Sequence, residues 1–127
     1  MYQYKAELIR VIDGDTVDAM IDCGFSTFKK ERIRLYGINT PETRTRDLKE
    51  KEKGLAAKAR LIELLKEGDN KFIVETSIDK KGKYGRLLGK LFRIKKSEHQ
   101  ALASSNKSYN EILLDEGHAK EYLGGKK

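Results

Sequence analysis

At 127 residues, the chain is long enough for one domain with a single hydrophobic core and too short for two. Its 27 Lys and Arg residues outnumber 20 Asp and Glu residues, and the net charge of +7 either attracts polyanions or simply keeps a lysine-rich surface soluble. A single cysteine, Cys23, excludes an intrachain disulfide, and no apolar run approaches membrane-spanning length. We expect one domain over residues 1–127, a monomer with no membrane association.

The first third of the chain predicts a three-stranded meander. Apolar and polar residues alternate from Tyr2 to Leu8 and change phase at Ile9, which indicates a long strand with a bulge. Asp13-Gly14 is typical of a hairpin turn. The return strand then carries apolar residues at alternate positions from 17 to 21, and a third strand covers about residues 27–36.

The next element is a long helix. Asp47 with Glu50 three residues later resembles a capping box, and Gly68 ends the helical run. Apolar residues at helical spacing predict the buried face, which comprises Leu55, Ala59, Ile62 and Leu65.

Two further strands and a short helix complete the pattern. The strands cover residues 71–77 and 87–94, and Ser108 with Glu111 forms a second capping box that opens a helix ended by Gly117. Five strands with a helix between the third and fourth are the order of an OB-fold barrel. We therefore predict a mainly β, α+β fold consisting of a five-stranded OB-fold barrel with a long helix and a short C-terminal helix.

Several polar residues have the chemistry of a phosphodiesterase. Asp15 lies in an oxygen-rich turn, Glu42 follows Pro41 in a loop, and Arg34 and Arg86 can each present a fork of donors to a phosphate. Each has a simpler interpretation: a tight turn for Asp15, an ordinary loop carboxylate for Glu42, a barrel-face ion pair for Arg34 and a solvated turn charge for Arg86. Together they favour the chemical interpretation.

Three motifs occur in one order along the chain. They are residues 11–17 (Val-Ile-Asp-Gly-Asp-Thr-Val), residues 34–42 from Arg34 through Asn-Thr-Pro-Glu, and residues 84–86 (Tyr-Gly-Arg). In motif, order and approximate spacing, the sequence resembles the staphylococcal nuclease (thermonuclease) family over roughly residues 8–123. The resemblance implies the same barrel and a calcium-dependent endonuclease that cuts DNA and RNA without regard to the sugar and leaves 3′-phosphate ends.

The resemblance also implies a set of site residues. The catalytic residues are Arg34, Glu42 and Arg86, and the Ca²⁺ ligands are Asp15, Asn39 and the backbone carbonyl of Thr40. Lys83 and Tyr84 are implied to contact phosphate and nucleotide. Tyr122 and Tyr109 are stacking candidates that could equally be packing residues.

Asn39 departs from the family pattern, because the secreted prototype has aspartate at that position. An asparagine oxygen has similar reach but removes one negative charge, so we expect weaker calcium binding rather than none. We expect the segment between Phe92 and Asn110 to be longer than in the prototype, and we expect no counterpart of the prototype's final helix after Leu123.

Two rival functions remain open from the sequence. One is a noncatalytic, nuclease-like module that binds nucleic acid or a protein, and the other is a basic OB-fold protein that protects single strands. The N-terminal residues 1–7 carry charges where a signal peptide needs an apolar run, which predicts a cytoplasmic protein. Since a nuclease retained in the cytoplasm threatens its own cell, a phage or mobile-element origin, an inhibitor or low calcium would account for it.

Overall fold

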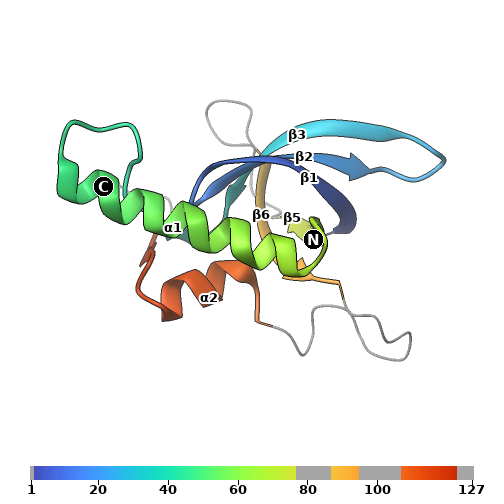
Figure 1. The fold of residues 1–127 in the computed structure, drawn as a ribbon. Coiled ribbons are helices and arrows are strands. Elements are labelled where there is room, and N and C mark those ends of the chain that lie inside the picture. Colours follow the sequence, from blue (N-terminus) through green and yellow to red (C-terminus); the bar gives the residue numbers. More distant parts are fainter. Residues whose placement is uncertain (1, 77–86, 95–106, 123–127) are drawn as a thin grey trace.

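The structure is a computed structural model that describes residues 2–76, 87–94 and 107–122. Five strands close into a barrel in the order β1-β2-β3-β6-β5, and a separate two-stranded sheet pairs β4 with β7 (Figure 1). The predicted five-stranded, mainly β barrel is confirmed. The elements are β1 (Gln3–Asp13), β2 (Thr16–Asp22), β3 (Phe28–Leu35), β4 (Ile38–Asn39), α1 (Leu48–Glu67), β5 (Lys71–Thr76), β6 (Leu87–Arg93), α2 (Tyr109–Asp115) and β7 (Lys120–Glu121).

The β1–β2 hairpin has the predicted turn and bulge. Its antiparallel register shifts between Leu8 and Arg10, where the apolar phase of the sequence changes, and Asp13 pairs with Thr16 across the turn. Val17, Ala19 and Ile21 on β2 are buried, as their alternation predicts. Because the side chains of a strand alternate between two faces, the intervening residues of β2 lie on the outside of the barrel.

The barrel closes through one parallel pair of strands, β3 and β6, and Asn110 of α2 fixes this closure. The side-chain amide of Asn110 donates to the carbonyls of Tyr36 (2.8 Å) and Gly89 (3.2 Å). Its Oδ1 accepts from the backbone N–H of Leu91 at 3.1 Å. Asn110 is buried, so these bonds satisfy backbone groups that water cannot reach. The position of β3 therefore depends on α2.

The long helix α1 crosses the lower side of the barrel in Figure 1, with α2 beneath it. Asp47 is its N-cap and accepts from the N–H groups of Lys49 and Glu50, but the Glu50 carboxylate binds elsewhere, so the capping box is incomplete. The predicted buried face was wrong apart from Leu65: the buried residues are Gly54, Ala57, Leu61, Leu64 and Leu65. No helix in the described ranges is long and apolar enough to span a membrane.

The second helix, α2, begins with the predicted capping box. The Ser108 hydroxyl accepts from the N–H of Glu111 at 3.1 Å, and the Glu111 side chain accepts in return from the N–H of Ser108 at 3.4 Å. The helix ends at Asp115 with Glu116 as its C-cap, and the next residue, Gly117, has a positive φ of 81°, the conformation that glycine favours. The reciprocal cap satisfies two helix-terminal N–H groups in an otherwise buried helix start.

A buried carboxylate on the outside of β2 joins three strands. Asp18 accepts from Arg32 Nε at 2.8 Å and Arg32 Nη2 at 3.1 Å on β3, and from Arg10 Nε at 3.0 Å on β1. The hydrogen bonds from Arg32 first, and then those from Arg10, lower the pKa of Asp18 from 3.8 to about 2. The charged form of Asp18 is therefore favoured by folding.

We predict that Asp18→Asn destabilises the protein only where Asp18 is ionised. The pKa of Asp18 is lowered in the folded state, so its contribution is present above pH 4 and is lost as the pH falls toward 2. The difference in unfolding free energy between parent and variant should be on the order of 1–2 kcal/mol at pH 7, since both arginines are half exposed. Urea denaturation at several pH values measures it. The control is Asp69→Asn, an exposed carboxylate in the turn after α1. A loss of stability in Asp18→Asn that does not change with pH would contradict the assignment.

Candidate functional site

Asp15 is the centre of a junction between three parts of the chain. It lies in the turn between β1 and β2 and is only 7% exposed. Its Oδ1 accepts from the Thr16 hydroxyl at 3.0 Å, and its Oδ2 accepts from the backbone N–H of Thr40 at 3.0 Å. Arg34 Nη1 on β3 lies 3.2 Å from the same Oδ2. One carboxylate thus joins the turn, β3 and the segment that follows β4.

Arg34 is held by the segment that it contacts. Its Nη1 donates to the carbonyls of Ile38 (3.0 Å) and Leu35 (3.4 Å), and its Nη2 donates to Asn39 Oδ1 at 3.0 Å. The expected ion pair is therefore present, in a side chain only 11% exposed. Within the described residues, Nε–H and the second Nη2–H have no protein acceptor, and these two donors share the edge of the guanidinium with which arginine makes bidentate bonds.

Tyr122 lies over this guanidinium. The Arg34 Cζ is 5.7 Å from the centre of the Tyr122 ring, within the range of a cation–π contact. The pairing of Asn39 with Lys120 and the bond from Tyr122 N–H to Gly37 O at 2.8 Å bring the ring there. Neither β4 nor β7 was predicted, because two-residue strands leave no alternation to detect. The structure therefore brings together Asp15, Arg34, Asn39, Thr40 and Tyr122.

Close packing of α1 places the loop that bears Glu42. A Cβ atom added to Gly54 would lie 2.6 Å from the carbonyl oxygen of Glu42 and 2.7 Å from that of Pro41, so this helix position admits only glycine without a shift. The Glu50 carboxylate, one turn earlier on α1, accepts from the backbone N–H of Glu42 at 3.2 Å. The side chain of Glu42 is exposed. Sequence reasoning missed both supports, although a glycine inside a helix is a recognisable sign of close approach.

The turn that carries Asp15 also packs closely on α1. A Cβ atom on Gly14 would lie 2.8 Å from the Cβ of Ala57 and 3.1 Å from Thr40 Cγ2. Asp13, which we interpreted as a turn residue, in addition accepts a short hydrogen bond from the hydroxyl of Thr43. Two hydrogen bonds to this turn, one accepted by Asp13 and one by Asp15, therefore hold the segment of residues 40–43.

A groove runs beside this junction, between the start of α1 and the segment that leads into β7. Asn39, Thr40 and Glu42 line it on one side, so it adjoins the Asp15–Arg34 cluster. Its other walls carry charged side chains of both signs from the two flanking segments, which sequence reasoning did not single out. The cations are Lys49, Lys53 and Lys120, the carboxylates are Asp47, Glu50 and Glu116, and His118 also lines the groove.

The donor atoms of the junction fit a hard cation. Asp15 offers a carboxylate oxygen, Asn39 an amide oxygen and Thr40 a carbonyl oxygen, and oxygen ligands of these kinds are those that Ca²⁺ accepts. The hydroxyl of Thr40 is buried without a hydrogen-bond partner, which leaves one more polar oxygen at this place. Among the described residues, no three His, Cys, Asp or Glu side chains are grouped, so a cation here would rely on neutral oxygens and a single carboxylate.

Of the other predicted residues, Tyr109 lies outside this cluster. Tyr109 is a packing residue rather than a stacking candidate, because it is 3% exposed and burial raises the pKa of its hydroxyl to about 12. Lys83, Tyr84 and Arg86 lie outside the described residues. The roles expected of them rest on the sequence.

Two comparisons with known proteins bear on this site. The family described as staphylococcal nuclease homologue matches residues 32–126. A protein of Phocaeicola vulgatus, named only as a UPF0597 protein, is 34% identical over 110 residues, which cover 78% of this chain and 26% of that protein. The chain thus spans about a quarter of the length of that relative. The family match includes Arg34, Asn39, Thr40 and Glu42 and begins after Asp15.

We predict that Gly54→Ala destabilises the protein although alanine is the better helix former. In an open helix position, the change would stabilise by about 1 kcal/mol. The contacts of the new Cβ with the carbonyls of Pro41 and Glu42 should outweigh this gain and give a net loss of about 1–2 kcal/mol. Thermal denaturation measures the effect, and Ala59→Gly, on the exposed side of α1, controls for helix propensity alone. A raised melting temperature for Gly54→Ala would show that the loop does not rest on this glycine.

Proposed function

The chain belongs to the staphylococcal nuclease family, and from that premise we propose that it is a calcium-dependent endonuclease that hydrolyses the phosphodiester bonds of DNA and RNA. The observation that carries the proposal is the Asp15–Arg34 junction, where a carboxylate, an arginine with two donors that no described residue accepts and two further oxygen ligands meet. Positive net charge supports it, since a surplus of cations speeds the capture of a polyanion.

Arg34 would bind the phosphate that is cut. Asp15, Asn39 and backbone carbonyls hold its Nη1 and one Nη2 donor, so rotation of the side chain is restricted. The Nε–H and remaining Nη2–H are then available as a preorganised pair for two phosphate oxygens. Negative charge grows on these oxygens when phosphorus becomes five-coordinate, so the pair would stabilise the transition state more than the bound substrate.

Asp15, Asn39 Oδ1 and the carbonyl of Thr40 would hold the calcium ion. When bound, the ion neutralises phosphate charge and polarises the phosphorus–oxygen bond. Buried Asp15 already has three partners, the Thr16 hydroxyl, the Thr40 N–H and Arg34, and these contacts orient its carboxylate. The N–H of Thr40 holds Asp15 while its carbonyl remains available as a ligand, so one residue would couple the loop to the ion.

Glu42 would act as the general base. It would accept a proton from the attacking water as the oxygen of that water bonds to phosphorus. The bond from phosphorus to the 5′ oxygen breaks, and this oxygen leaves with a proton supplied by Arg86 or solvent, so the product keeps a 3′-phosphate. Lys83 and Tyr84 would contact the flanking phosphate and nucleotide. Gly54 and Glu50 serve this step indirectly, by fixing the backbone from which Glu42 projects.

The proposed geometry would act on both polymers. The groups assigned to bond cleavage, namely Arg34, Glu42 and the calcium ligands, address the phosphate, its bridging oxygens or the attacking water, and none of them reads a 2′-hydroxyl or a base edge. Recognition through phosphate carries no information about sequence or sugar. We therefore propose cleavage of DNA and RNA without regard to the sugar.

One observation favours a second candidate, a noncatalytic module that binds nucleic acid or protein. The junction has a single carboxylate, and three N–H donors of Arg34 already bond to acceptors within the protein. If the remaining donors and the neutral oxygens do not support chemistry, the same cationic surface would still bind nucleic acid. The two candidates differ in a direct assay of cleavage.

The deciding experiment incubates the purified protein with plasmid and with RNA, in calcium or in excess chelator. We predict cleavage of both only in calcium. Glu42→Gln should slow single-turnover cleavage by about 10² to 10⁴, as for the loss of a general base, while the fold is unchanged. Glu52→Gln, an exposed carboxylate on α1, is the matched control. Cleavage by Glu42→Gln within a few-fold of the parent would remove Glu42 from the reaction, and no cleavage by the parent would favour the binding module.

We predict that Asn39→Asp tightens calcium binding. The new carboxylate keeps the oxygen that accepts from Arg34 Nη2 and adds one negative charge beside Asp15. A unit charge pair at 4 Å contributes about 1 kcal/mol even in water, so affinity should rise at least about fivefold. Calorimetric titration measures it, and Asn70→Asp adds the same charge at an exposed position. Equal gains in both variants would show a general charge effect rather than a ligand at residue 39.

A further inference from the structure

The outer face of the β2–β3 hairpin continues from Arg34 toward the far end of the barrel. In the antiparallel register, Arg34 pairs with Thr16, Arg32 with Asp18 and Lys30 with Met20. Ile33, between Arg32 and Arg34, and Leu35, after Arg34, are buried in the core, so the three cationic residues share the outside of β3. The candidate phosphate ligand is therefore the first of a row of cations.

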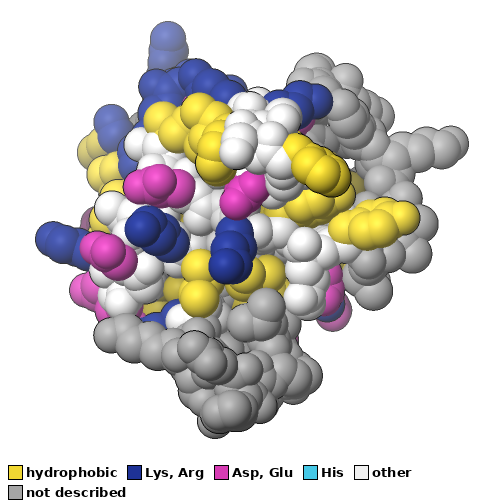
Figure 2. Space-filling view, turned by 90° about the vertical axis from the view of Figure 1, so that its right-hand side faces the viewer, with side chains coloured by type: hydrophobic (Ala, Val, Ile, Leu, Met, Phe, Trp, Pro, Cys, Tyr) yellow, Lys and Arg dark blue, Asp and Glu magenta, His cyan; other side chains and the backbone are white. Residues whose placement is uncertain are grey.

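The row has regular spacing. Residues two apart on one face of a strand are separated by about 6.6–6.8 Å. Arg34, Arg32 and Lys30 thus present three cations at even intervals, and Phe28, the next residue on this face, lies about 20 Å from Arg34 along the strand. In Figure 2, which faces the hairpin end, Lys and Arg side chains gather along the top, the level at which β3 runs in Figure 1.

Asp18 holds two of these guanidinium groups in place without removing the positive charge of the face. Arg32 uses its Nε and Nη2 edge for Asp18, and its other donors face solvent, with 46% of the side chain exposed. Arg10 is 62% exposed on the other side of the same carboxylate. Lys30 makes no ion pair with any described residue. Asp18 and Asp22, the second of which lies beside Phe28, are therefore two carboxylates against the three cations Arg10, Arg32 and Lys30, and one positive charge remains on this face.

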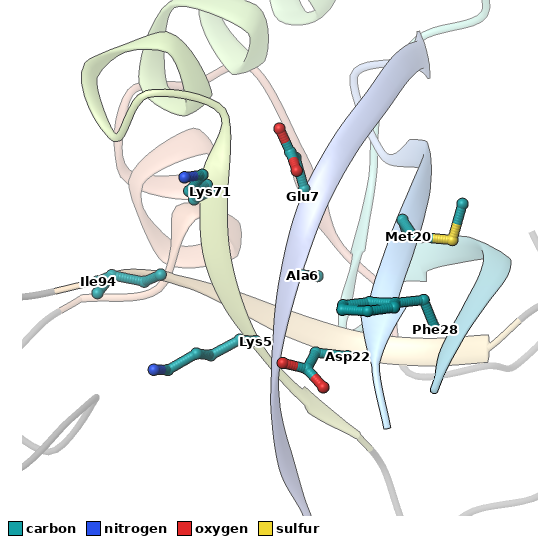
Figure 3. Close-up of a pocket in the computed structure, with 8 residues that line it drawn as sticks. All are labelled: Lys5, Ala6, Glu7, Met20, Asp22, Phe28, Lys71 and Ile94. Atoms are coloured by element: carbon teal, nitrogen blue, oxygen red, sulfur yellow. The ribbon is translucent and has the colours of Figure 1, made fainter. Parts of the chain in front are cut away.

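An exposed aromatic ring lies at the end of the row. Phe28 is 60% exposed, and its ring crosses from β3 over β2 between Met20 and Asp22 (Figure 3). It forms one wall of a shallow groove across the outside of β1, β2 and β5, where Lys5 and Lys71 are the flanking cations. Phe25 at the hairpin tip is fully exposed as well. Neither ring contributes to the core, so packing does not explain why an aromatic residue occupies either position.

We propose that the outer face of the β2–β3 hairpin is a binding track for one strand of nucleic acid that leads to Arg34. Arg32 and Lys30 contact successive phosphates beyond Arg34, Arg10 lies level with Arg32 on the other side of Asp18, and an unpaired base stacks on Phe28. Evenly spaced cations complement a polyphosphate chain, and an aromatic face binds any base once it is unpaired. The inference rests on the proposed nuclease function only in that the track leads to Arg34 as the site of cleavage. Binding of the strand along the track does not require cleavage.

The test compares Phe28→Ala and Lys30→Gln with the parent, and Lys66→Gln, an exposed lysine at the end of α1, is the matched control. Affinities for a fifteen-nucleotide and a three-nucleotide oligothymidylate are measured by fluorescence anisotropy in chelator, so that nothing is cut. Phe28→Ala should weaken binding of the long oligonucleotide by about 5- to 150-fold. Lys30→Gln should reduce the slope of log affinity against log salt by about 0.7, the value for one single-strand phosphate contact.

Further measurements distinguish binding along the track from binding at the Asp15–Arg34 site. Binding of the three-nucleotide probe, and its cleavage in calcium, should be equal in the parent and both variants, because a strand this short does not extend from Arg34 to Phe28. Unchanged affinity of both variants for the long oligonucleotide would overturn the track even if the parent cuts. The predicted losses in a parent that does not cut would support the track and refute the nuclease. An equal loss for duplex DNA in Phe28→Ala would overturn the stacking of an unpaired base.

Discussion

The carboxylate of Asp15 is the interaction on which the site depends. Its two oxygens take donors from Thr16, Thr40 and Arg34, so one buried charge fixes the hairpin turn, the third strand and the loop after it in a single arrangement. A buried carboxylate is unfavourable unless such partners surround it. The polar junction is therefore assembled as a unit, because loss of any member would leave another group buried and unsatisfied.

Small residues in α1 make this arrangement geometrically accessible. The helix approaches two loops so closely that Gly54 and Ala57 face backbone and a second glycine, Gly14, with no room for larger side chains. Such close backbone contacts fix the positions of the two loops relative to the helix, since protein interiors are packed near crystal density. The helix thus serves as a rigid support for both the Asp15 turn and the Glu42 loop, which approach it from different strands.

The sequence was informative where patterns are local and repeated. Strand alternation, the bulge after Leu8 and the cap at Ser108 follow from neighbouring residues, and the structure confirms them. The buried face of α1 was wrong because Leu55 and Ile62 suited an apolar stripe, whereas close approach required glycine and alanine. The contacts of Arg34 with Asn39 and Tyr122 depend on pairing between distant two-residue strands, which no local pattern encodes. The single domain and the roles of the site residues stay predictions.

The side-chain amide of Asn110 affects how the protein folds during its synthesis. It bonds to the carbonyls of Tyr36 and Gly89 and thereby holds the parallel closure of the barrel, and Tyr122 follows on the same C-terminal segment. Contacts of such high sequence separation form late and slowly. A nascent chain on the ribosome that has not yet released residue 110 can pair β1, β2 and β3 but lacks the support of Asn110 for the parallel closure of β3 with β6 and the Tyr122 ring over Arg34. The site therefore comes together only after almost the whole chain has been synthesised.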